Sequence, residues 1–320
     1  MSVHMLAGRP RAQPPPGPRT YALPLAVAIA IALFAWRQPA FVGAENLLGI
    51  LRQVAIVGIM ATAMTFVIMT GGIDLSIGPV LALSGLVGVL SLDAGAGLPL
   101  ALAIALSLGL AIGLLNGGLV AFGGLPPIIV TLATLSIVRG SALLLGGPDL
   151  HNVRGQPAFS FIGTGSLAGL PFSVWIFTGV ATLFVFAQRR TPLGLLVAAI
   201  GDNERAAWLS GHRTRLVTTL IYGLSGLSAA LAGLILSSQV HTGSATYGEF
   251  GTELDVIAAV VLGGTQLAGG RGSVVRTLVG VLCLGALNNA MNMLDVPIDN
   301  QLIAKGFIIA VALGLSQPRG

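Results

Sequence analysis

Long apolar runs separated by short polar stretches make up most of this chain. Several runs reach the roughly 20 residues that an α-helix needs to cross a bilayer. The pattern predicts ten membrane-spanning helices, at residues 21–36, 46–69, 77–92, 98–122, 127–145, 172–187, 215–238, 254–262, 274–294 and 301–315. Segments 77–92 and 254–262 are short for a crossing, so we expect them to be tilted, broken or shielded from lipid. The predicted fold class is an all-α integral membrane protein.

Polar residues divide the chain into a tail, a membrane domain and one large loop. Residues 1–20 are rich in Pro and Arg, which predicts a disordered cytoplasmic tail. The membrane domain is predicted to cover residues 21–316, with a cytoplasmic loop at 188–214.

The most informative polar stretch is GDNERAAWLSG, at residues 201–211. Asp202 or Asn203 can cap a short helix there, and Gly211 can end it. Such a helix carries Trp208 and Leu209 and suits insertion into a groove on a soluble partner. An ordinary solvated loop is the alternative interpretation.

Composition supports the membrane assignment and narrows the chemistry. Hydrophobic residues are 54% of the chain, charged residues are 8%, and the mean hydropathy is +0.91. The 45 glycines favour closely packed helices, because small residues let membrane helices approach one another. Cys283 is the only cysteine, so one chain can form neither a disulfide framework nor a cysteine metal site. His151, His212 and His241 are scattered along the chain and also indicate no metal site.

Basic residues predict the orientation in the membrane. With the N-terminus inside, most arginines fall on the cytoplasmic side, as the positive-inside rule requires. Both termini are then cytoplasmic, and the island at residues 201–211 faces the cytoplasm. This placement explains the net charge of +5 by membrane orientation, so nucleic acid is not an expected partner.

A short repetition suggests two related halves. Asn116 lies ten residues before Pro126 near the end of one span, and Asn288 lies nine before Pro297 near the end of another. Five spans separate the two patterns, and an odd offset inverts the second copy, as in transporters built from inverted repeats. Chance similarity in a sequence rich in Gly, Ala and Leu is the alternative.

Four ordered motifs then support a resemblance to a family. They are MTGGIDLSIGPVLALSG, PPIIVTLATLSIVRG, GDNERAAWLSG and ELDVIAAVVLGGTQLAGGRGSV. Together with LGALNNAMNML they resemble the permeases of bacterial ribose-type ABC importers, over residues 46–315. The resemblance implies an inner-membrane permease subunit that carries a monosaccharide or a similar small polar solute. It implies three partners: a cytoplasmic ABC ATPase, a periplasmic sugar-binding protein and a second permease subunit, alike or different.

The chain itself has no GxxxxGK[ST] phosphate loop and no group of residues suited to hydrolysis. We therefore expect neither an enzyme nor a cofactor-binding protein, and ATP hydrolysis belongs to another subunit. The resemblance assigns ATPase coupling to the polar island, with Arg271 in a glycine-rich cytoplasmic turn as a further contact. The coupling candidates are Gly201, Asp202, Asn203, Glu204, Arg205, Ala206, Ala207, Ser210, Gly211 and Arg271.

Polar residues within or beside the spans are candidates for the translocation path: Asp74, Ser76, Asn116, Asn288 and Asn292. For Asp74 we favour a structural role, capping backbone amides at a cytoplasmic turn. Interhelical hydrogen bonds are the commoner use of Asn in a bundle. Asn288 and Asn292 share a helix face and are the better pair for a path. Snorkelling or pairing with an acid accounts for Arg139 and Lys305.

Two other functional classes stay open from the sequence. A secondary transporter without an ATPase is the main alternative, although such carriers usually couple through ionisable residues near the midplane, and few are found in these spans. A structural membrane scaffold is the other. The cytoplasmic island favours the ATP-driven permease.

Overall fold

The computed structural model of the chain describes residues 22–248 and 251–316. The predicted cytoplasmic tail at residues 1–20 lies outside these ranges. The described residues form twelve α-helices, one 3-10 helix and four two-residue strands. The all-α class predicted from the hydropathy pattern is confirmed.

The helices follow one another along the chain with short connections. Their bounds are α1 Ala22–Arg37, α2 Ala44–Met69, α3 Ile77–Asp93, α4 Leu98–Ala121, α5 Pro127–Gly146, α6 Pro157–Thr164, α7 Phe172–Arg190, α8 Pro192–Leu209, α9 Thr214–Val240, α10 Thr252–Leu262, α11 Val274–Met293 and α12 Ile298–Ser316, with the 3-10 helix η2 at Pro39–Val42. Strand β1 (His151–Asn152) pairs antiparallel with β4 (Thr242–Gly243), and β2 (Ser166–Leu167) pairs antiparallel with β3 (Leu170–Pro171).

Each of the ten predicted segments coincides with a helix, whereas α6 and the first half of α8 were not predicted. Among the described residues, six helices are long and apolar enough to cross a membrane: α2, α4, α5, α7, α9 and α11. Helix α3 is apolar but shorter, as expected for segment 77–92. The chain is thus a multi-pass membrane protein, and the count of ten crossings stays a prediction.

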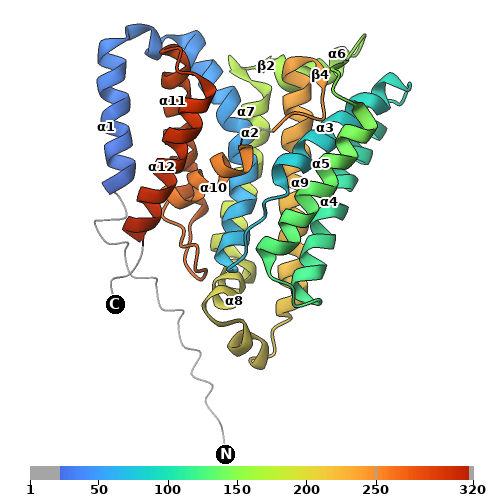
Figure 1. Ribbon diagram of the computed structural model, residues 1–320, viewed down its shortest axis with the longest axis vertical. Coiled ribbons are helices and arrows are strands. Elements are labelled where there is room, and N and C mark those ends of the chain that lie inside the picture. Colours follow the sequence, from blue (N-terminus) through green and yellow to red (C-terminus); the bar gives the residue numbers. More distant parts are fainter. Residues whose placement is uncertain (1–21, 249–250, 317–320) are drawn as a thin grey trace, which may run out of the picture.

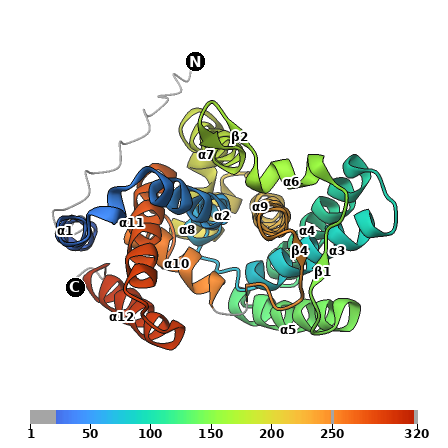
Figure 2. The ribbon, with the colours of Figure 1, turned by 90° about the horizontal axis from the view of Figure 1, so that it is seen from above.

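Helices α2 and α9 lie at the centre of the bundle when it is seen from above (Figure 2). Their apolar stretches are 61% and 67% buried, against 22% for α4. Glycine explains how closely α9 packs, because a side chain added at Gly113 of α4 would meet the Tyr222 carbonyl of α9. A side chain at Gly226 of α9 would meet the Gly109 carbonyl of α4 in the same way. Small residues therefore let these two helices touch along their backbones.

The helices are arranged as two inverted halves. Helix α2 runs toward the end of the bundle that carries α8, and α9 runs in the opposite direction (Figure 1). Short α3 packs on α9 while short α10 packs on α2, and α4 packs on α9 while α11 packs on α2. The contacts are reciprocal between the sets α2 to α5 and α9 to α12. This matches the inverted repeat predicted from Asn116 in α4 and Asn288 in α11.

The two short helices begin inside the bundle. After α2, the chain turns at Gly71, whose φ of 83° favours glycine, and an extended segment runs back between the helices before α3 starts (Figure 1). Helix α10 also lies at mid-height (Figure 1), and the described residues 244–248 before it are not helical. Segments 77–92 and 254–262 are therefore the shielded half-helices that their lengths predicted.

The two ends of the bundle differ. Helix α6 and the short strands cover one end, and α8 projects from the other (Figure 1). Helix α1 begins and α12 ends at the end that carries α8. Among the described residues, several arginines predicted to be cytoplasmic lie in or beside α8: Arg189, Arg190, Arg205, Arg213 and Arg215.

Candidate functional site

The polar island folds as a short helix at the end of α8. Helix α8 is interrupted at Asn203, whose φ of −163° and ψ of 95° are not helical. The Asn203 side-chain oxygen accepts a hydrogen bond from the Ala206 backbone N–H at 2.9 Å, so it caps a new helical segment. Gly211, with φ of 86°, ends that segment through hydrogen bonds to Trp208 and from His212 to Ala207. The predicted capping by Asn203 and ending at Gly211 are both confirmed.

This short helix, residues 204–209, presents apolar side chains at the α8 end. Trp208 is 59% exposed and Leu209 is 69% exposed, although Ala207 beneath them is buried. Asp202, Arg205, Ala206 and Ser210 are exposed as well. The surface combines charge with a large aromatic ring, a composition suited to binding a protein partner.

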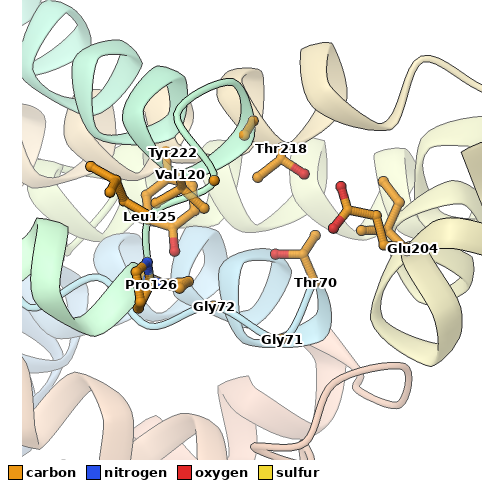
Figure 3. Close-up of a pocket in the computed structure, with 13 residues that line it drawn as sticks. Thr70, Gly71, Gly72, Val120, Leu125, Pro126, Glu204, Thr218 and Tyr222 are labelled. Carbon is orange, nitrogen blue, oxygen red and sulfur yellow. The ribbon is translucent and has the colours of Figure 1, made fainter.

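A cavity of about 330 Å³ separates the short helix from the rest of the α8 end (Figure 3). Glu204 lines it together with Thr70 at the end of α2 and Thr218 of α9. In Figure 3 the Glu204 carboxylate points into the cavity and the Thr218 hydroxyl points toward it. Glu204 is nevertheless exposed, and it also lines an adjoining depression together with Arg205, Trp208 and Arg215.

The base of the short helix is pressed against the bundle at Gly201. The Gly270 N–H donates to the Met69 carbonyl at 2.9 Å, and a side chain added at Gly201 would overlap both groups. The Asp202 carboxylate occupies the space where Gly270 would carry a side chain. Arg271 follows directly and is exposed. The structure thus brings Arg271 next to the coupling candidates of the island.

Gln188, near the end of α7, holds the same glycine-rich loop. Its side-chain amide donates to the Gly272 carbonyl at 3.1 Å and accepts from the Val274 N–H at 2.9 Å. The same amide nitrogen lies 3.3 Å from the Met69 sulfur. The loop between α10 and α11 is therefore fixed to α7 and to the end of α2.

Three of the five path candidates belong to one buried network. The Asp74 carboxylate accepts from the Ser76 hydroxyl at 2.6 Å and its N–H at 3.0 Å, and from the Ser225 hydroxyl of α9 at 2.8 Å. The Asn116 amide of α4 donates to Ser76 at 3.0 Å and accepts from Thr134 of α5 at 2.6 Å. This chain of hydrogen bonds joins α3, α4, α5 and α9.

The position expected for Asp74 was wrong, although the geometry supports its structural role. We expected a cytoplasmic turn, but Asp74 is fully buried on the segment that returns into the bundle. It does cap a backbone amide, that of Ser76, as the structural interpretation required. Burial favours pairing of every carboxylate oxygen, and here both oxygens accept hydrogen bonds.

The α11 asparagines are separate from this network, since no hydrogen bond between described residues links the two. Asn292 accepts from Gln301 of α12 at 2.8 Å, and the side-chain oxygen of buried Asn288 has no hydrogen-bond partner in the described part of the chain. Asn289 points elsewhere, as predicted, and exchanges two hydrogen bonds of 2.9 Å with Asn46 of α2.

Two basic residues within the bundle, Lys305 and Arg139, have polar partners. Lys305 of α12 forms an ion pair with Asp255 of α10 at 2.9 Å, which confirms the predicted pairing with an acid. Arg139 of α5 donates to the carbonyls of Ala245 and Tyr247, in the stretch that precedes α10. Lys305 therefore stabilises α10 itself, and Arg139 stabilises the residues that precede it.

Sequence reasoning missed Ser225, Thr134 and Gln188. Ser225 and Thr134 lie in apolar helices among many small residues, so no local pattern marks them. Gln188 directly precedes Arg189 and Arg190, so the sequence suggests an exposed polar end of the helix, whereas the Gln188 side chain faces inward.

Comparison with known proteins identifies the family. The family model described as branched-chain amino acid transport system / permease component matches residues 46–313. The chain belongs to this permease family. Membership confirms the prediction of a transport permease subunit that is not itself an enzyme.

Curated relatives are similar over nearly the whole chain. The ribose import permease protein of Bacillus subtilis is 43% identical over 88% of each chain. The L-arabinose ABC transporter permease protein of Azospirillum brasilense is 34% identical, over 88% of this chain and 82% of the relative. The galactofuranose transporter permease protein of Escherichia coli is 37% identical, over 84% and 79%. No solved structure is significantly similar to the chain.

Proposed function

We propose that this chain forms the translocation path of an ABC importer for a monosaccharide in the bacterial inner membrane. Relatives named for ribose, L-arabinose and galactofuranose support a sugar as the cargo. A periplasmic sugar-binding protein delivers that sugar, and a second permease subunit completes the path. Asn288 and Asn292 remain the candidates that contact cargo, because neutral amides bind hydroxyl groups without the desolvation cost of a charge.

The observation that carries the proposal is the capped short helix at residues 204–209. Its ends are fixed by Asn203 and Gly211, and Trp208 and Leu209 stand exposed between them. An ATPase in the cytoplasm receives this helix in a surface groove, as amphipathic helices dock elsewhere. The arginines at the same end of the bundle support a cytoplasmic position for that end.

The proposed ATPase contacts are exposed residues of the short helix and of the neighbouring glycine-rich loop. Arg205, Trp208 and exposed Arg271 contact the ATPase surface directly. Glu204 is exposed as well, and its carboxylate points into the cavity beside Thr70 and Thr218. Closure of two ATPase subunits then moves the short helices and shifts the path between outward-open and inward-open states.

Copurification tests the proposal. The detergent-solubilised wild type is expected to recover a separate ATPase, and Glu204→Lys combined with Arg205→Glu is expected to lose it. Arg154→Glu is the matched control, since Arg154 is an exposed arginine of the loop that precedes α6 at the opposite end of the bundle. Recovery of the ATPase with the double variant would contradict the docking assignment. A wild type that recovers none would favour a secondary transporter.

A further inference from the structure

The cytoplasmic ends of the two inverted halves are joined by a backbone hydrogen bond. Met69 ends α2 in the first half, and Gly270 lies in the loop between α10 and α11 in the second. The Gly270 N–H donates to the Met69 carbonyl at 2.9 Å. Next to it, the position of a side chain on Gly269 would lie 3.0 Å from the Gly71 nitrogen. The two halves therefore meet backbone to backbone.

Gly201 of α8 covers this hydrogen bond. An added side chain at Gly201 would overlap both the Met69 carbonyl and the Gly270 nitrogen. The position of a side chain on Gly269 would also lie 3.1 Å from the Gly201 Cα. A movement of α8 therefore displaces both halves together. These contacts are between backbone atoms, which cannot give way by a change of side-chain rotamer.

Gln188 reinforces the same junction from α7. Its side-chain amide nitrogen donates to the Gly272 carbonyl, and its side-chain oxygen accepts from the Val274 N–H. Those two backbone groups lie just before α11 and at its first residue. The start of α11 is thus tied to α7, which leads directly into α8.

We propose that Gly201 and Gln188 are positioning residues that transmit movement of the short helix to both halves of the permease. This inference rests on the proposed function, because it assumes that an ATPase moves the short helix. It assigns to Gly201 a role distinct from docking: the residue contacts the bundle, while residues 204–209 contact the partner.

The test separates docking from transmission. The complex of the full chain with its ATPase is reconstituted in proteoliposomes with the binding protein, and uptake of radiolabelled ribose and of radiolabelled L-arabinose is measured per ATP hydrolysed. Gly201→Ala is expected to retain the ATPase, because the short helix and its caps are unchanged. Its uptake per ATP is expected to fall at least about fivefold, the lower end of typical coupling between two sites.

Gly179→Ala in α7 is the matched control, since a side chain there would meet no atom within 4 Å. It is expected to behave as wild type. Uptake per ATP equal in the two alanine variants would overturn the proposal. Loss of the ATPase from Gly201→Ala alone would also overturn it, because Gly201 would then act in docking.

Gln188→Leu provides a second test if Gly201→Ala does not accumulate in the membrane. This change removes both hydrogen bonds to the loop and replaces the amide with an apolar side chain that has one heavy atom fewer. We expect a retained ATPase with reduced uptake per ATP, whereas Gln156→Leu, whose side chain makes no capping hydrogen bond to α6, is expected to leave the ratio unchanged. A wild-type ratio in Gln188→Leu would overturn the proposal. A wild type without any ATPase would overturn both this inference and the proposed function.

Discussion

Asp74 depends on Ser225 for the hydrogen bond to its second carboxylate oxygen. Ser225 lies in α9, and its hydroxyl donates to that oxygen at 2.8 Å while both residues are buried. Ser225→Ala leaves this oxygen without its donor, so we expect a loss of about 1–3 kcal/mol, the usual cost of an unsatisfied buried group. The measurement is the melting temperature of the purified protein in detergent, which is expected to fall.

Ser136→Ala is the control for this prediction. Ser136 lies on an exposed face of α5 and hydrogen-bonds only the Leu132 carbonyl of its own helix among the described residues. Equal melting temperatures for the two variants would show that Asp74 does not need Ser225.

The same residues show what a sequence can predict at this scale. Asp74 stands out because an acid in an apolar segment is rare, and Asn203 stands out because it precedes a polar stretch that can form a helix. Ser225 carries no such mark, since serine is common in these helices, and Gly201 stands out only as the first residue of the polar island. Their roles follow from which helices pack together, and hydrophobic periodicity does not determine that.

At the scale of elements, the short helix depends on the Asn203 cap. Asn203→Ala removes the acceptor for the Ala206 N–H, which costs about 0.5–2 kcal/mol at other helix N-termini. We expect weaker ATPase binding by the purified chain, measured by titration, because the partner must then order the helix. Asn203→Ser retains an acceptor and is expected to bind as the wild type does. Equal loss of binding in both variants would contradict a capping role.

Helix α10 is held to α12 by the pair of Lys305 with Asp255. The side chains are only 10% and 16% exposed, so removal of one partner leaves a poorly solvated charge. Breaking a fully buried pair costs about 3–5 kcal/mol, and the slight exposure here reduces that cost. We expect Lys305→Met and Asp255→Leu each to lower the melting temperature, and the double variant to be less damaging than the sum. Strictly additive effects would show that the two residues act independently.

At the scale of the whole molecule, hydropathy predicted the helices but not how they meet. Ten apolar segments were visible in the sequence, and each coincides with a helix, because burial in lipid requires satisfied backbone groups. Helix α6 has eight residues and the strands have two each, which is too short for a periodic signal. In the sequence, the inverted arrangement was visible only in the positions of Asn116 and Asn288. Many different small and apolar residues allow the same helix packing, so the two halves need not have similar sequences.

The proposed orientation predicts which end of the bundle faces the cytoplasm. Ser166 lies at the end with the short strands and His212 lies just after α8, and both are exposed. In a Cys283→Ser background, a cysteine at position 166 is expected to react with a membrane-impermeant thiol reagent in intact cells. A cysteine at position 212 is expected to react only after the membrane is opened. The physical reason is the positive-inside rule, because the arginines around α8 favour the cytoplasmic side. Labelling of position 212 but not 166 in intact cells would reverse the orientation, and an ATPase in the cytoplasm could then not reach the short helix.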